Sequence, residues 1–180
     1  AMTRPDRRHP LPDSPVAPRV AVAGEAARLT AHLLPPLRPT LDRVMAAVAR
    51  GIDSEGADRR PVHGDLYEAQ VLVGDDGTLG LVDLDDLGLG DPLLDAATFS
   101  AHLVALALLP GPDTTRILTY RAELRRAFLD HLGAHDRCLR WREAYAMLLL
   151  APGPFRALRP DWPTKVTARV EASSELVHAL

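Results

Sequence analysis

Residues 61–97 read PVHGDLYEAQVLVGDDGTLGLVDLDDLGLGDPLLDAA, and this stretch decides the fold. Two short runs rich in Val and Leu, residues 70–73 and 79–83, flank the sequence Gly-Asp-Asp-Gly, which is a strong turn signal. The pattern predicts a β-hairpin. Because its turn is tight, the hairpin brings Gln70, at the start of one strand, next to Asp83, at the end of the other.

The residues on either side of the hairpin have mostly helical periodicity. Asp91 followed by Pro92 is typical of an N-cap and the first helical position, and it opens a mostly apolar helix, expected to be buried, that extends to about residue 109. A short β-type run is expected at residues 61–63. Further helices are predicted over residues 24–34, 39–52, 113–132, 137–150 and 163–180. The predicted fold class is therefore mainly α (α+β), a helical domain with a small β insert.

The chain begins with a proline-rich segment. Five prolines fall within the first 18 residues, and each removes a backbone donor and disfavours helix just before it. We therefore expect an extended arm or interlobe linker over residues 1–20, followed by one helical domain over residues 21–180.

Composition narrows the class of protein. Of the 180 residues, 47% are hydrophobic and 25% are charged, which is ordinary for a globular chain. The single cysteine, Cys138, cannot form an intrachain disulfide, and the polar start does not resemble a secretory signal, so a cytoplasmic location is expected. The most apolar stretch, residues 96–109, is interrupted by Ser100 and His102 and is shorter than the roughly 20 residues that span a bilayer, so no membrane partner is expected.

Charge is distributed unevenly along the chain. Residues 61–115 carry ten Asp or Glu and no Lys or Arg, although the net charge of the whole chain is only −3. The flanking segments are close to balanced, so no nucleic acid partner is expected. This acidic block is therefore expected to contain the functional residues.

Three carboxylates of this block are candidates for a metal site. Asp83 and Asp85 alternate with Leu84 and point to the same side if the strand continues, and the loop from Asp65 leads directly into Gln70. Carboxylates brought together repel or take up protons unless a cation lies among them, and such hard oxygen ligands suit Mg²⁺. The sequence therefore predicts that these three carboxylates and the Gln70 amide converge on a divalent ion.

The same residues resemble a known signature. His63-Gly64-Asp65 with Gln70, followed by the run Leu81 to Asp85, is similar to the HGDxxxxN and IDW(D/E) motifs of aminoglycoside and choline kinase-like phosphotransferases. The similarity continues through residues 88–92 and 95–97, which are close to the GxGDPxxDLA pattern of that family.

The resemblance implies a mechanism and an architecture. It makes Asp65 the catalytic base for the hydroxyl of a small-molecule substrate, Asp83 a metal ligand, and Gln70 the replacement for a metal-binding Asn. Gln70, Asp83 and Asp85 are therefore the candidate ligands of Mg²⁺, and ATP is the implied phosphoryl donor. The chain then corresponds to the helical C-terminal lobe of a protein-kinase-like fold, and the helices from residue 113 onward form the substrate side.

The segment before His63 differs from the family pattern. The family places a β-rich lobe with a nucleotide-clamping Lys ahead of this motif, whereas the 62 residues here contain no Lys and no glycine-rich loop. We therefore expect the second lobe alone, with weak ATP binding and no appreciable kinase activity as an isolated chain. The expected partner is either a nucleotide-binding lobe or a second copy of the chain.

Two other functions remain open from the sequence. Leu81 to Asp85 also fits a haloacid-dehalogenase-like phosphatase, with Asp83 as nucleophile and Asp85 as acid, although Lys165 is the only lysine of the chain. The chain is alternatively a degenerate lobe that binds a small molecule or a partner without turnover.

Overall fold

Two antiparallel helices follow the N-terminal arm in this computed structural model, which describes residues 11–54 and 59–178. They are α1 (Val20–Leu33) and α2 (Arg38–Ser54), joined by the 3₁₀ turn η1 (Pro35–Leu37). The residues that α1 buries recur at helical spacing and are nearly all small, namely Ala23, Ala26, Ala27, Thr30 and Ala31. Both predicted helices are confirmed, and the alanine stripe lets α2 and α5 approach α1 closely.

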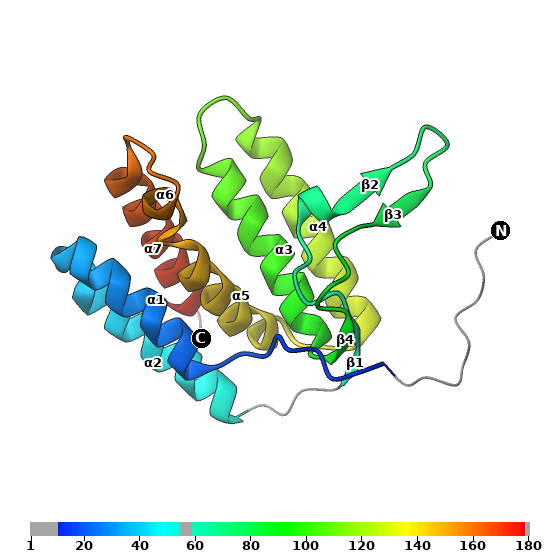
Figure 1. The fold of residues 1–180 in the computed structure, drawn as a ribbon, viewed down its shortest axis with the longest axis horizontal. Helices are drawn as coiled ribbons and strands as arrows, with labels where there is room; N and C mark the ends of the chain where they lie inside the picture. Colours follow the sequence, from blue (N-terminus) through cyan, green and yellow to red (C-terminus); the bar gives the residue numbers. More distant parts are fainter. Residues whose placement is uncertain (1–10, 55–58, 179–180) are drawn as a thin grey trace.

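The helices that follow the β insert pack around one central helix. They are α3 (Pro92–Ala107), α4 (Thr114–Leu132), α5 (Asp136–Leu150), α6 (Gly153–Arg156) and α7 (Trp162–His178). Figure 1 shows α5 between the α1–α2 pair and the α3–α4 pair. Every residue of α5 from Trp141 to Leu148 is buried, as expected for a helix covered on all sides. The mainly helical prediction is confirmed, and α6 is a short addition to it.

Four short strands form two separate antiparallel sheets. They are β1 (Arg60–Val62), β2 (Val71–Val73), β3 (Leu79–Leu81) and β4 (Gly88–Gly90), with the 3₁₀ turn η2 (Glu68–Gln70) directly before β2. The predicted hairpin is confirmed as β2 paired with β3, and it projects from the helical body in Figure 1. β1 pairs with β4, a strand that the sequence did not predict.

The described part of the proline-rich arm is docked on β4. Asp13 forms a parallel bridge with Leu89, whose backbone N–H donates to the Pro12 carbonyl at 2.8 Å and whose carbonyl accepts from the Ser14 N–H at 3.1 Å. The arm leaves no room for a side chain at Gly88, where a Cβ would lie 2.4 Å from the Ser14 nitrogen. This close approach explains the glycine at the first position of β4.

No helix in the described part of the chain is both long and apolar enough to cross a bilayer.

Candidate active site

The loop that carries Asp65 is hydrogen-bonded to α3. Both carboxylate oxygens of the buried Asp95 accept backbone hydrogen bonds, from the His63 N–H at 2.7 Å and from the Gly64 N–H at 3.0 Å. Burial raises the pKa of the Asp95 carboxyl, and the two N–H donors oppose that shift. Asp95 therefore has a structural role, since it fixes the backbone directly before Asp65.

The imidazole of His63 connects this loop to the end of the hairpin. Its Nε2 lies 2.9 Å from the Val82 carbonyl oxygen, which can only accept, and its Nδ1 accepts from the Asp65 N–H at 3.4 Å. The two contacts together select the neutral tautomer that carries its proton on Nε2. His63 thus positions the backbone of Asp65.

Gly64 allows this loop to pass close to the acidic turn that follows β3. Its φ is +92°, in the left-handed region, and an added Cβ would lie 2.6 Å from the Asp86 Cβ and 2.8 Å from the Asp86 oxygen. The turn is fixed from its other side, because the Ser14 hydroxyl donates to the same carbonyl at 3.0 Å. Asp86 is therefore enclosed between the loop and the docked arm.

Replacing Gly64 by alanine is expected to destabilise the fold more than the same change at Gly77. Gly77 has a similar φ of +80° but nothing within 4 Å of an added Cβ, so it isolates the backbone term, which is about 1–2 kcal/mol. Gly64→Ala adds a collision with Asp86 to that term. Urea unfolding of both variants measures the difference, and equal losses would show that the loop and the turn are not in contact.

The hairpin brings two of the three predicted metal-ligand side chains together. Gln70 is buried, and its Nε2 donates to the Asp83 Oδ2 at 3.1 Å, while the Val82 N–H donates to the Gln70 carbonyl at 3.1 Å. Asp83 adopts a left-handed conformation with φ 60° and is exposed. The predicted proximity of Gln70 and Asp83 is confirmed.

The premise that the strand continues through Asp83 to Asp85 is wrong, and the convergence of three carboxylates on a divalent ion stays a prediction. β3 ends at Leu81, so strand alternation does not place Asp83 and Asp85 on one face. Asp65, Asp83 and Asp85 are all exposed, and no group of three or more His, Cys, Asp or Glu side chains in residues 11–54 and 59–178 is arranged to hold a metal ion. Asp83 is in the left-handed region, so the backbone turns away from the strand direction at this residue. The alternation of side chains along a strand does not predict such a local change.

Asp91 fixes the start of α3 to the central helix. Its Oδ1 accepts from the Leu93 N–H at 3.0 Å, which confirms the predicted N-cap, and its Oδ2 accepts from the Arg142 Nε at 2.6 Å. The side chains of this ion pair are only 6% and 3% exposed. The pair therefore joins α3 and α5 directly below the candidate site.

An aromatic contact beside Asp65 was not predicted from the sequence. The Tyr67 ring stacks on His102 of α3 with a centroid separation of 4.3 Å, and the His102 Nδ1 lies 3.8 Å from the Glu68 Oε2. Burial lowers the pKa of His102, while the nearby Glu68 and Asp65 oppose the shift. In the sequence, His102 stands out only as a polar residue within an apolar helix, and this does not indicate that Tyr67 is its partner.

The candidate site combines features from three parts of the fold. A backbone-fixed loop presents an exposed aspartate, an amide and carboxylate pair lies at the end of the adjacent hairpin, and a capped helix supports both, as expected for an enzyme that transfers phosphoryl groups. The chain belongs to the phosphotransferase enzyme family, whose family model matches residues 3–141. That match includes every candidate residue discussed above. A search of curated proteins found no matching relative.

Proposed function

We propose that the chain is the helical catalytic lobe of a small-molecule kinase that transfers the γ-phosphoryl group of ATP to a substrate hydroxyl. The observation that carries this proposal is the pairing of Gln70 with Asp83 at 3.1 Å, next to a rigid loop that presents Asp65. In phosphoryl transfer most of the rate comes from positioning and from neutralising charge, and the site is built for positioning.

Asp65 is proposed as the catalytic base. Its backbone N–H is bonded to His63, its side chain is exposed, and its carboxylate accepts no hydrogen bond from a residue that the structure describes. A carboxylate on a fixed backbone, with its own oxygens unpaired, is free to orient a substrate hydroxyl and to take its proton. The oxygen of that hydroxyl then forms a bond to phosphorus as the bond to ADP breaks.

Gln70 and Asp83 are proposed to hold Mg²⁺. One amide oxygen and one carboxylate are hard donors, and Mg²⁺ in kinase sites is bound by one or two such groups, with waters and nucleotide phosphates completing the shell. The exposed Asp83 and the lack of a larger carboxylate group in the described residues fit this mode better than an all-protein cage. When bound, the ion neutralises phosphate charge. Asp85, two residues after Asp83, is proposed as an outer ligand.

The hairpin supports the assignment to one lobe of two. Aliphatic side chains along it are strongly exposed, with values of 55% for Leu72 and 69% for Val73 and Leu79. A two-stranded hairpin is marginal alone, so these side chains favour cover by a nucleotide-binding lobe. The haloacid-dehalogenase alternative gains no support, because β3 pairs only with β2 within the described residues, and antiparallel to it.

A paramagnetic ion tests the proposal on the chain itself. Mn²⁺ replaces Mg²⁺ at oxygen ligands, and with excess ATP present it is expected to broaden the backbone amide signals of Asp65, Gln70 and Asp83 in nuclear magnetic resonance spectra. Asp83→Asn is expected to remove this selective broadening because it removes the only carboxylate of the pair.

The matched control is Asp75→Asn, which changes an exposed aspartate of the same acidic block at the hairpin turn. The control should leave the broadening of the Asp65 and Gln70 signals unchanged. Broadening that is centred on residues 74–77, or that survives Asp83→Asn, would overturn the metal assignment and with it the proposed function.

A further inference from the structure

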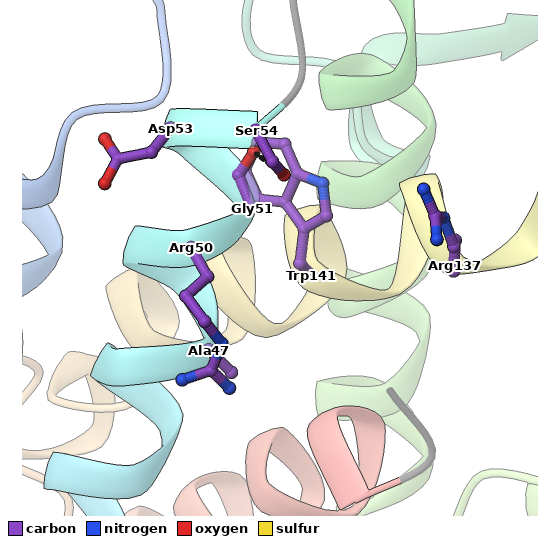
Figure 2. Close-up of a pocket in the computed structure, with 7 residues that line it drawn as sticks. All are labelled: Ala47, Arg50, Gly51, Asp53, Ser54, Arg137 and Trp141. Atoms are coloured by element: carbon purple, nitrogen blue, oxygen red, sulfur yellow. Dashed lines mark hydrogen bonds between the residues drawn. The ribbon is translucent and has the colours of Figure 1, made fainter.

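A cavity of about 570 Å³ lies between the end of α2 and the start of α5. Its lining residues are drawn in Figure 2 and are Ala47, Arg50, Gly51, Asp53, Ser54, Arg137 and Trp141. None of them belongs to the segment from His63 to Asp95 that forms the candidate active site. The cavity is therefore distinct from the candidate active site.

The aromatic wall of the cavity is held rigidly. Trp141 is only 4% exposed, and an added Cβ on Gly51 would lie 2.4 Å from the Trp141 Cγ, so the backbone of α2 packs directly against the indole. The guanidinium carbon of Arg142 lies 4.2 Å from the centre of the same ring system. The indole is therefore held in place, and the small part of it that faces the cavity is a preformed apolar surface.

The charged wall of the cavity is cationic and free to bind. Arg50 and Arg137 are exposed, and neither forms a hydrogen bond or an ion pair with another residue of the described ranges. Figure 2 shows the Arg137 side chain alongside Trp141, whereas the carboxylate of Asp53 points away from the indole. The cavity therefore combines two unpaired guanidinium groups with one acid turned aside.

Unlike Arg50 and Arg137, several more buried arginines of the fold have carboxylate partners. Arg121 and Arg125 share Glu143, Arg125 also pairs with Asp136, and Arg142 pairs with Asp91. Guanidinium groups bind planar oxyanions through two parallel hydrogen bonds, and their weak hydration favours sites next to aromatic rings. An apolar wall beside free guanidinium groups matches a ligand with an apolar body and an anionic end.

We propose that this cavity is a binding site for a small aromatic oxyanion, an aryl phosphate or aryl carboxylate. The ring of the ligand contacts the small part of Trp141 that faces the cavity, and its oxyanion is bound by Arg137 and Arg50, whose exposed side chains are free to turn toward it. The hydroxyl of Ser54, which contacts the Gly51 carbonyl at 3.4 Å, supplies a further polar group at the mouth. This site is separate from the acidic loop and does not depend on the proposed function.

Tryptophan fluorescence tests the site directly. The chain has two tryptophans, so Trp162→Phe leaves Trp141 as the only indole, and Phe at position 162 retains a ring beside Phe155. Phenyl phosphate is expected to change the Trp141 emission saturably. Inorganic phosphate, which has only the charge, and phenol, which has only the ring, are each expected to bind at least about tenfold more weakly.

Arginine variants test whether Arg50 and Arg137 bind the oxyanion. Arg50→Gln combined with Arg137→Gln is expected to weaken phenyl phosphate binding by at least about tenfold, since two charge-assisted contacts are lost. The matched control is Arg28→Gln, which removes an exposed arginine of α1 that does not line the cavity. Amide chemical shifts of residues 47–54 and 137–141, recorded for the unmodified chain with phenyl phosphate, give an independent readout.

Three outcomes overturn the proposal. The first is the absence of a saturable change in both emission and amide shifts. The second is equal binding of inorganic and phenyl phosphate, which would show unspecific attraction of anions. The third is an equal loss of affinity in the Arg28 control, which would show that net charge and not the cavity binds the ligand.

Discussion

Asp65→Asn is expected to lower the rate of phosphoryl transfer by about 10²–10⁴-fold in an enzyme reconstituted from this lobe and a nucleotide-binding lobe. Asparagine keeps the size of the side chain and the backbone hydrogen bond to His63 but cannot accept the proton of the substrate hydroxyl. The affinity for nucleotide should change little, because a base acts at the hydroxyl and not at the phosphates.

The Asp83→Asn variant distinguishes the metal-binding role proposed for Asp83 from the base role proposed for Asp65. This variant should raise the Mg²⁺ concentration needed for half-maximal rate, whereas Asp65→Asn should leave that concentration unchanged. Transfer rates measured against Mg²⁺ concentration distinguish these effects, with Asp75→Asn at the hairpin turn as the control that should behave like the unmodified enzyme. Small and equal effects of the first two variants would contradict both assignments.

Asp91→Ala is expected to lower the free energy of unfolding by about 3–5 kcal/mol, because it leaves the guanidinium of Arg142 buried without its carboxylate. The two side chains are 6% and 3% exposed, so water does not screen the pair. The change also removes the N-cap of α3, which contributes about 1 kcal/mol of the loss. Urea unfolding followed by far-ultraviolet circular dichroism measures the effect.

A second N-cap provides the control for this prediction. Asp113 begins α4, and its Oδ1 accepts from the Arg116 N–H at 3.0 Å, but it is exposed and has no buried arginine partner. Asp113→Ala should therefore cost only the capping term of about 1 kcal/mol. If Asp91→Ala does not fold, Asp91→Asn retains a cap oxygen and still removes the charge. Equal losses at positions 91 and 113 would show that the buried ion pair adds nothing.

Local signals carried most of the successful sequence predictions. The Gly-Asp-Asp-Gly turn placed the hairpin, and the hairpin alone brought Gln70 to Asp83, because its register is set by the turn. Asp91-Pro92 placed the start of α3 for the same reason, since a cap and a following proline act within one helical turn. In each case the structural cause lies within a few residues of the signal.

Two features that the sequence did not predict depend on distant segments. β4 contains two glycines, which are unfavourable in strands, and it exists because β1 and the arm pair with it. The stacking of Tyr67 on His102 joins a loop to a helix that starts far along the chain. The end of β3 at Leu81 depends on the left-handed Asp83, which no periodic pattern encodes. Tertiary contacts determine the first two features, and a local backbone conformation determines the third.

The docked arm has a consequence for the order in which the chain folds. The hydrogen bond from Ser14 to Asp86 spans 72 residues, whereas the hairpin register pairs Val71 with Leu81. Loop-closure entropy grows with the logarithm of length, so the longer closure alone costs about 2 kcal/mol more than the shorter one. The hairpin and the helices can form from local contacts within microseconds. On entropy alone, the acidic turn is therefore expected to be fixed late, when the arm reaches β4.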